Sequence, residues 1–161
     1  MSKLIRTDIC VIGGGVGGVL IASAISQMGI KTIVVESQNL GGERLNGGSI
    51  KTFSLLSIGR LIEQIRSAQL YGVKAIPNGV DYDRVLNYIE RTIKEFEPDY
   101  SQERLEGLGV NLIFGQAKFL TKKTLQAAEN IVTAKRFIIA TGSCLKTPKI
   151  DGLDEVPFYT N

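Results

Sequence analysis

The glycine-rich segment near the N-terminus constrains the fold of this chain more than any other feature. It contains the pattern G-x-G-x-x-G at Gly13, Gly15 and Gly18. A short apolar run, Asp8–Ile12, precedes it, and apolar residues recur at helical spacing from Val16 to Met28. The sequence therefore predicts a buried strand, a tight turn and a helix, in that order, with Gly29 following the end of the helix.

This order of elements is typical of a site that binds a dinucleotide. Gly13 permits a tight turn, Gly15 lets the backbone approach a pyrophosphate, and Gly18 lets the helix pack closely on the strand. The N-terminus of the helix then offers free N–H groups to the anion. Glu36 ends a second predicted strand, Lys31–Glu36, near the spacing at which a carboxylate accepts hydrogen bonds from an adenosine ribose. An acid there would repel a 2′-phosphate, so FAD or NAD is favoured over NADP; a purely structural glycine turn is the alternative.

Composition excludes several other classes of protein. The 161 residues fit one domain, and a hydrophobic content of 43% is enough for a core. The net charge of +3 is spread along the chain and gives no support to nucleic-acid binding. Two distant cysteines without any histidine indicate neither a disulfide framework nor a metal site. Apolar runs too short to span a bilayer argue against a membrane protein, and a cytoplasmic location is expected.

The remaining segments predict an α/β fold. A glycine-rich loop is expected at Leu40–Ser49 and a helix at Ile50–Tyr71. A break at Pro77–Gly79 precedes a second helix that Asp81 caps and Pro98 ends. One or two further helical turns are expected at Ser101–Leu108. Short strands are predicted at Val110–Phe114, Ala117–Leu120, Lys123–Ala127, Asn130–Thr133 and Phe137–Ala140. The result is a Rossmann-like domain with a parallel sheet, a helical insertion and a small antiparallel β-meander.

Three further segments carry a family resemblance. The run Leu40–Ile50, the segment Gly115-Gln-Ala117, and the run Phe137–Ser143 followed by Ile150-Asp-Gly152 are similar to signatures of the pyridine nucleotide-disulfide oxidoreductases. The resemblance extends in order over nearly the whole chain. It implies that residues 1–161 form one FAD-binding domain and that FAD is the cofactor.

The resemblance also implies roles for individual residues. Gly41 and Gly42 would pass beside the pyrophosphate, Ala117 would offer backbone groups to the adenine, and Thr141-Gly142 would pack near the flavin. A simple turn that ends a strand is the alternative for Thr141-Gly142. No catalytic residue or metal ligand is predicted. The full predicted cofactor-binding set is Gly13, Gly15, Val16, Gly17, Gly18, Glu36, Ser37, Gly41, Gly42, Glu43, Arg44, Ala117, Thr141 and Gly142.

One departure from the family pattern bears on the chemistry. In the family this loop holds two cysteines, separated by four residues, which exchange electrons between the flavin and a disulfide. Their positions align with Arg44 and Ser49, which lack the sulfur atoms that this exchange requires. A solvated loop arginine is favoured for Arg44 over a cation beside the cofactor, and a helix cap for Ser49. Cys10 is expected in the core, and Cys144 is expected to be inert.

The family resemblance leads to an expected function. Dithiol chemistry is absent, and the family's nicotinamide-binding and interface domains have no counterpart in these residues. We expect an FAD-dependent oxidoreductase component, either a subunit of a split enzyme or a truncated chain. A second chain or the missing domains would then supply NAD(P)H binding and the dimer interface. The alternative is a non-catalytic FAD-binding or assembly subunit.

Overall fold

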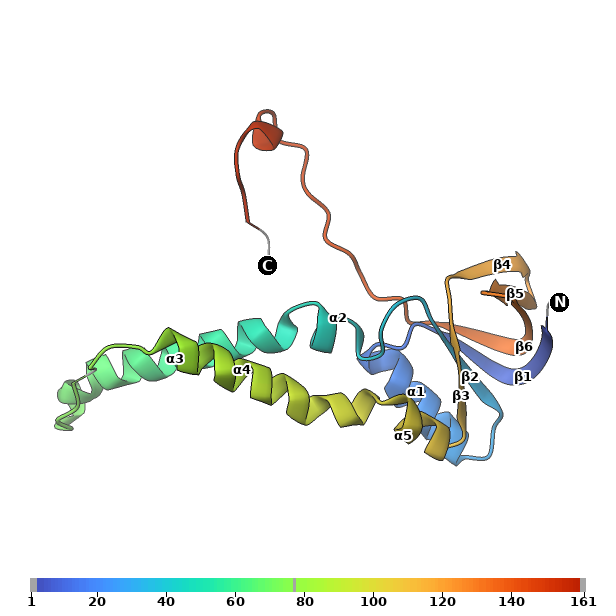
Figure 1. The fold of residues 1–161 in the computed structure, drawn as a ribbon, viewed down its shortest axis with the longest axis horizontal. Coiled ribbons are helices and arrows are strands. Elements are labelled where there is room, and N and C mark those ends of the chain that lie inside the picture. The colour runs from blue at the N-terminus through green and yellow to red at the C-terminus, as the bar shows by residue number, and fades with distance from the viewer. Residues whose placement is uncertain (1–2, 77, 160–161) are drawn as a thin grey trace.

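The computed structural model describes residues 3–76 and 78–159. A six-stranded sheet of order β3-β2-β1-β6-β5-β4 forms one end of the molecule, and two long helices project from it as an arm (Figure 1). The strands are β1 (Lys3–Ile12), β2 (Thr32–Glu36), β3 (Val110–Phe114), β4 (Ala117–Thr121), β5 (Thr124–Ala127) and β6 (Asn130–Ile139). The predicted α/β class, with its parallel sheet and antiparallel meander, is confirmed.

The first strand, helix and second strand form the predicted unit. Helix α1 (Val16–Gln27) follows β1, and β2 lies parallel to β1 with Val11 opposite Val34. Gly29 has a φ of +77°, as expected just after a helix. Strand β1 begins at Lys3, earlier than predicted, because its first residues pair with β6.

Side chains alternate across the central strands and so build two cores. Cys10 and Ile12 point to one face, where Leu125 and Val132 of the meander cover them. Val11 points to the other face, where it packs with residues of α1 and of α5 (Gln102–Gly107), among them Leu105. Since both faces of β1 and β2 are covered, these strands have the continuous apolar sequence of a buried parallel sheet.

Two details of the last third of the chain differ from the prediction. Strand β3 lies parallel to β2 at the edge of the main sheet and does not belong to the meander. The two strands expected at Asn130–Thr133 and Phe137–Ala140 are one strand, β6, which pairs with β1 along its whole length. The residues between them remain in the strand because the pairing with β1 continues through Ala134 and Arg136. The Lys135 ammonium lies 2.6 Å from the Asp8 carboxylate on β1, to which it donates a hydrogen bond. This hydrogen bond also lowers the pKa of Asp8.

The arm contains the helical insertion. It consists of α3 (Ser49–Ser67) and α4 (Tyr82–Phe96), which lie side by side and extend away from the sheet (Figure 1). Asp81 caps α4 as predicted, because its side chain accepts a hydrogen bond from the Arg84 N–H at 3.1 Å. Pro77, part of the predicted break, lies outside the described residues. Three 3-10 turns lie at Ala68–Tyr71, Glu97–Tyr100 and Leu153–Glu155.

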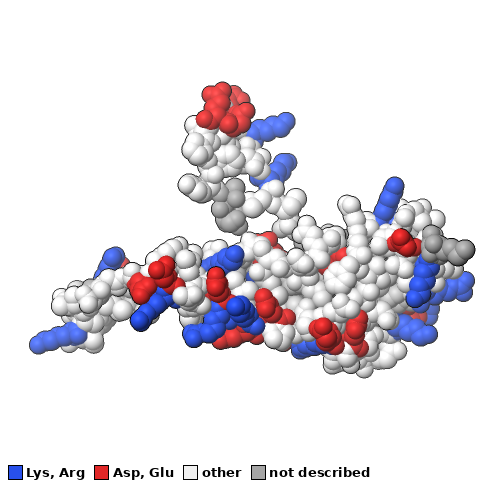
Figure 2. Space-filling view, in the orientation of Figure 1, with Lys and Arg blue, Asp and Glu red and all other residues white. Residues whose placement is uncertain are grey.

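Figure 2 shows acidic and basic side chains intermixed over the arm and the sheet domain on this face of the molecule. Among the helices that the structure describes, none is both long and apolar enough to cross a bilayer.

The two cysteines lie in opposite environments, which gives a test of the fold. Cys10 is fully buried, and burial raises the pKa of its thiol from 9.0 to about 11, whereas Cys144 is exposed. Because the thiolate is the reactive form, we expect Cys144 alone to react with a chromogenic disulfide reagent near pH 8 in the native protein. The assay should count one thiol in the native state and two in denaturant; two fast-reacting native thiols would contradict the placement of β1.

Candidate dinucleotide-binding site

The glycine turn between β1 and α1 is fixed by backbone contacts. The Gly13 N–H donates to the Val35 carbonyl of β2 at 2.8 Å. Gly13 has a φ of +106°, which side chains rarely tolerate, and a β-carbon added to it would overlap the Ala140 carbonyl oxygen at the end of β6. The turn is therefore enclosed between two neighbouring strands.

Gly18 sets the distance between α1 and this turn. A β-carbon added to Gly18 would overlap the carbonyl oxygen of Gly13. The overlapped oxygen belongs to the backbone, so no flexible side chain can move to make room. Gly18 therefore has the packing role that its place in the pattern predicts.

Gly15 and Gly17 have space around them instead. A β-carbon on Gly15 would meet only the Cα of Gly42, at 3.9 Å, and one on Gly17 would meet no atom within 4 Å. Gly15 caps α1 without a side-chain hydrogen bond, and the first turn of α1 contains no acidic residue. The first N–H groups of the helix, and the positive end of its dipole, are therefore free for a ligand anion.

The second glycine segment lies against the first. The Gly41 N–H donates to the Gly14 carbonyl at 2.9 Å, and Gly41 forms a parallel bridge with Gly15. Gly41 and Gly42 have φ values of +87° and +50°. Residues far apart in the sequence thus form one glycine-lined wall at the carboxyl ends of β1 and β2, the edge at which open α/β sheets bind ligands.

Glu36 has a structural role that the sequence analysis did not anticipate. The side chain is 8% exposed, and its Oε2 accepts a hydrogen bond from the Gly14 N–H at 2.5 Å. Its Oε1 accepts from the Gln38 N–H at 2.8 Å and from the Ser37 hydroxyl at 3.4 Å. Since an ionised carboxylate has about four acceptor positions, capacity for a ligand hydroxyl remains. Glu36 therefore holds the glycine turn and still faces the site.

The predicted residues converge on a groove of about 910 Å³, near the upper end of the range for ligand pockets. Twelve of the fourteen predicted residues line it: Gly13, Gly15, Val16, Gly17, Glu36, Ser37, Gly41, Gly42, Glu43, Arg44, Thr141 and Gly142. Gly18 lies behind the groove in the packing contact described above.

Ala117 lies in an adjoining cavity of about 240 Å³. Gly13, Glu36, Ser37 and Thr141 line both spaces, so the cavity and the groove are continuous around the end of β2. Several further lining residues are not in the predicted set, among them Asn46, which belongs to the glycine-rich segment expected to be a loop. The others are Ile12, Val35, Gln38, Asn39, Gly47, Gly115, Gln116, Ala140, Ser143 and Cys144.

The segment expected to be a loop contains a short helix, α2 (Gly42–Asn46), and begins α3. Arg44 lies in α2 and not in a loop, is partly exposed, and has its guanidinium 4.8 Å from the centroid of the Phe96 ring of α4. Ser49 is not the cap of α3 either: Gly48 occupies that position, with a φ of +106° and no side-chain hydrogen bond. Arg44 and Ser49 both line a second pocket, between α2, α3 and α4.

The two cysteines of the chain are not joined in a disulfide. Cys10 is buried in β1 as predicted, and Cys144 is exposed at the rim of the groove. Within residues 3–76 and 78–159, no three cysteine, aspartate or glutamate side chains are grouped as metal ligands.

Comparison with known proteins agrees with this geometry. Residues 7–161 match the family described as "Pyridine nucleotide-disulphide oxidoreductase". The chain is 30% identical over 156 residues to the mercuric reductase of Bacillus cereus, covering 96% of this chain and 24% of that protein. It is 32% identical over 143 residues to the dihydrolipoyl dehydrogenase of Geobacillus stearothermophilus, covering 86% and 30%. The chain thus spans about a quarter to a third of the length of these relatives.

Proposed function

The chain belongs to the pyridine nucleotide-disulphide oxidoreductase family, whose members are FAD-dependent flavoproteins, and we propose that it forms the FAD-binding part of an oxidoreductase resembling dihydrolipoyl dehydrogenase and mercuric reductase. The observation that carries this proposal is the groove at the carboxyl ends of β1 and β2. Its glycine wall, open helix N-terminus and buried acid form one continuous surface.

The residues present fit a dinucleotide cofactor. The open space at Gly15 and Gly17 admits a pyrophosphate close to the N–H groups of α1. Glu36 can accept a hydrogen bond from a ribose hydroxyl, and the cavity beside Ala117 offers space and backbone groups for the adenine. Thr141 and Gly142 would then lie on the flavin side. FAD would supply the chemistry of accepting and releasing an electron pair.

The chain would perform this chemistry without a redox-active dithiol. The loop positions that carry the family's cysteines hold Arg44 and Ser49. The chain has two cysteines, and both are free: Cys10 is buried in the core at β1, and Cys144 is exposed beside the groove. The electron acceptor would therefore be something other than a disulfide exchanged through this loop.

The binding site of the electron donor and the subunit interface would lie outside these 161 residues. The relatives are three to four times as long as the aligned region, so we propose that nicotinamide binding and subunit contacts reside in further domains or in a second chain. In this arrangement the 161 residues hold and orient the cofactor, and the glycine turn and Glu36 fix its adenosine half.

Anaerobic reduction of the flavin-loaded protein tests the proposal. We expect a yellow protein that takes up one electron pair per FAD, because there is no second two-electron acceptor in the chain; an additional disulfide would raise the uptake to two pairs. The native thiol count should stay the same before and after reduction. A colourless protein that retains no FAD would contradict the cofactor assignment, and uptake of two pairs would contradict the loss of dithiol chemistry.

A further inference from the structure

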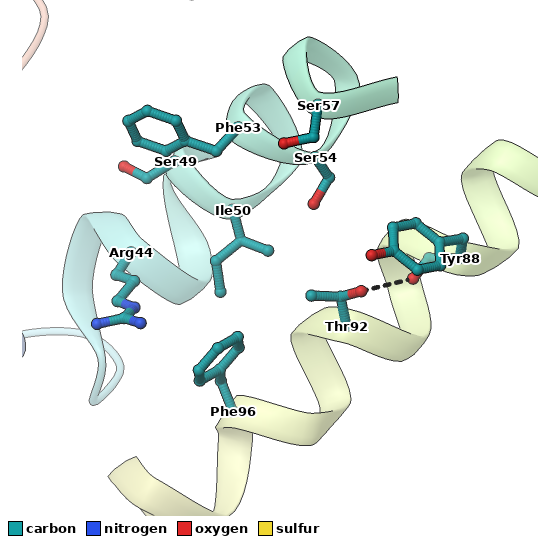
Figure 3. Close-up of a pocket in the computed structure, with 9 residues that line it drawn as sticks. All are labelled: Arg44, Ser49, Ile50, Phe53, Ser54, Ser57, Tyr88, Thr92 and Phe96. Atoms are coloured by element: carbon teal, nitrogen blue, oxygen red, sulfur yellow. Dashed lines mark hydrogen bonds between the residues drawn. The ribbon is translucent and has the colours of Figure 1, made fainter. Parts of the chain in front are cut away.

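A pocket of about 530 Å³ opens between α2, α3 and α4, beside the groove. Figure 3 shows side chains from all three helices pointing into this space, with Ile50 near its centre and Phe96 on the opposite wall. Its volume is within the range that holds small organic ligands. The nine lining residues are Arg44, Ser49, Ile50, Phe53, Ser54, Ser57, Tyr88, Thr92 and Phe96.

Arg44 is the only charged side chain among the described residues that line the pocket, which indicates an anionic ligand. Its guanidinium lies over the Phe96 ring, at 4.8 Å from the centroid. Among the described residues, no carboxylate forms an ion pair with it and no acceptor receives a hydrogen bond from it. A guanidinium stacked in this way keeps its edge free for the two parallel hydrogen bonds that a carboxylate accepts.

The side chains that line the pocket indicate the chemistry of the rest of the ligand. Ile50 is buried near the centre, and the Phe96 ring faces it from α4, whereas the Phe53 ring lies at the rim and is 70% exposed. Ser54, Ser57 and Tyr88 carry hydroxyl groups around this surface, while the Thr92 hydroxyl already donates to the Tyr88 carbonyl at 2.9 Å. Aromatic rings favour stacked or edge-on contact with another ring. A flat ring with a carboxylate at one end matches this distribution.

Arg44 also joins the pocket to the groove. Among the residues that line either space, it is the one common to both. A molecule whose carboxylate is held by Arg44 would therefore lie next to the wall of the cofactor groove.

We propose that the pocket between α2, α3 and α4 binds a small planar aromatic carboxylate, with Arg44 holding the carboxylate and with Ile50 and Phe96 contacting the ring. This binding does not require that the groove contain FAD. It is a second site, and its test is separable from that of the cofactor.

To test this, benzoate is titrated into the full chain as purified, and binding is measured by calorimetry. Benzamide, which has the same shape without the charge, should bind roughly 10- to 100-fold more weakly, as expected for the loss of a charged pair of hydrogen bonds. Acetate, which has the charge without the ring, should also bind more weakly. Equal affinity for benzoate and benzamide would overturn the proposal, and so would an absence of benzoate binding.

Substitutions at Arg44 and at a control position test where benzoate binds. Arg44→Gln should weaken benzoate binding by the same factor as the change to benzamide, and Arg44→Lys should weaken it less, because lysine keeps the charge but not the planar fork. Arg91→Gln removes the same charge from an exposed position on α4 outside the pocket and should leave the affinity unchanged. Circular dichroism should show that each variant is folded. Equal losses in the Arg44 and Arg91 variants would mean a general charge effect and overturn the proposal.

Two further measurements distinguish a failure of this proposal from a failure of the proposed function and from association of two copies of the chain. The flavin absorbance of the same sample reports the cofactor, so a protein without FAD that still binds benzoate would refute only the proposed function. Size-exclusion chromatography reports the oligomeric state. If a second copy covers the arm and benzoate does not bind, the occupant of the pocket is that copy and the proposal is wrong.

Discussion

A Gly18→Val substitution is expected to destabilise the domain by about 3 kcal/mol or more. The added β-carbon would overlap the Gly13 carbonyl oxygen, and neither backbone segment can yield easily. Gly13 is itself held by its hydrogen bond to β2 and by its contact with the end of β6. Relief would require α1 to move away from the sheet and to uncover the core that contains Val11 and Ala22. Thermal unfolding of the protein without cofactor should show a melting temperature lowered by roughly 6 to 12 °C.

The neighbouring position provides a matched control. Gly17→Val adds the same side chain one residue earlier in α1, where a β-carbon meets no atom within 4 Å. Valine is also a better helix former than glycine, so the free energy of unfolding should stay the same or rise slightly. A similar loss of stability in both variants would show that the first turn of α1 does not tolerate any side chain. The contact with Gly13 would then not be the cause of the destabilisation.

The parts of the fold that could be predicted from sequence are those in which each residue's local preference agrees with its tertiary surroundings. The strand, turn and helix around Gly13 to Gly18 have apolar runs, glycines and helical spacing that all indicate the same structure. The cap at Asp81 was predictable for the same reason. These signals are local in the sequence, so they need no knowledge of what packs against them.

The errors occurred where a distant partner decides the structure. Lys135 interrupts the apolar pattern of β6, and the strand continues through it because the pairing with β1 extends on both sides of this residue. The sequence of β3 resembles that of a meander strand, and its parallel pairing with β2 depends on the arm and α5, which bring the chain back to that edge. The short helix α2 begins at Gly42, directly after Gly41, and two successive glycines with positive φ are typical of a loop.

In the candidate site, too, the features set by local sequence were predictable and those set by distant contacts were not. The glycine motif and Glu36 indicated a dinucleotide from sequence alone, and the structure brings twelve of the fourteen predicted residues to one groove. The hydrogen bond from Gly14 to Glu36 could not be predicted, since it depends on how the end of β2 meets the turn. The pocket of Arg44 was also missed, because its walls come from α3 and α4, whose contact with each other is set by tertiary packing.

A Gly15→Asp substitution should abolish FAD binding while leaving the fold intact. Gly15 is the N-cap of α1, with ordinary backbone angles of φ −72° and ψ −174°, and its added β-carbon would have space. Aspartate is a favourable N-cap residue and interacts well with the helix dipole, so the protein without cofactor should be equally stable or a few tenths of a kcal/mol more stable. The new carboxylate would occupy the anion position and repel the pyrophosphate, a repulsion on the order of 4 kcal/mol between unit charges about 4 Å apart. Fluorescence titration with FAD should show an affinity lower by at least about 100-fold.

An isosteric neutral variant separates charge from volume at this position. Gly15→Asn caps the helix about as well as aspartate and fills about the same space, but it does not repel an anion. If the pyrophosphate lies at the N-terminus of α1, the asparagine variant should bind FAD more weakly than the native protein and more strongly than the aspartate variant. The difference between the two variants should shrink as salt concentration rises, because salt screens the repulsion at an open site. FAD affinities that are the same in the native and aspartate proteins would place the pyrophosphate elsewhere, since a carboxylate at the helix N-terminus cannot be neutral toward a bound phosphate anion there.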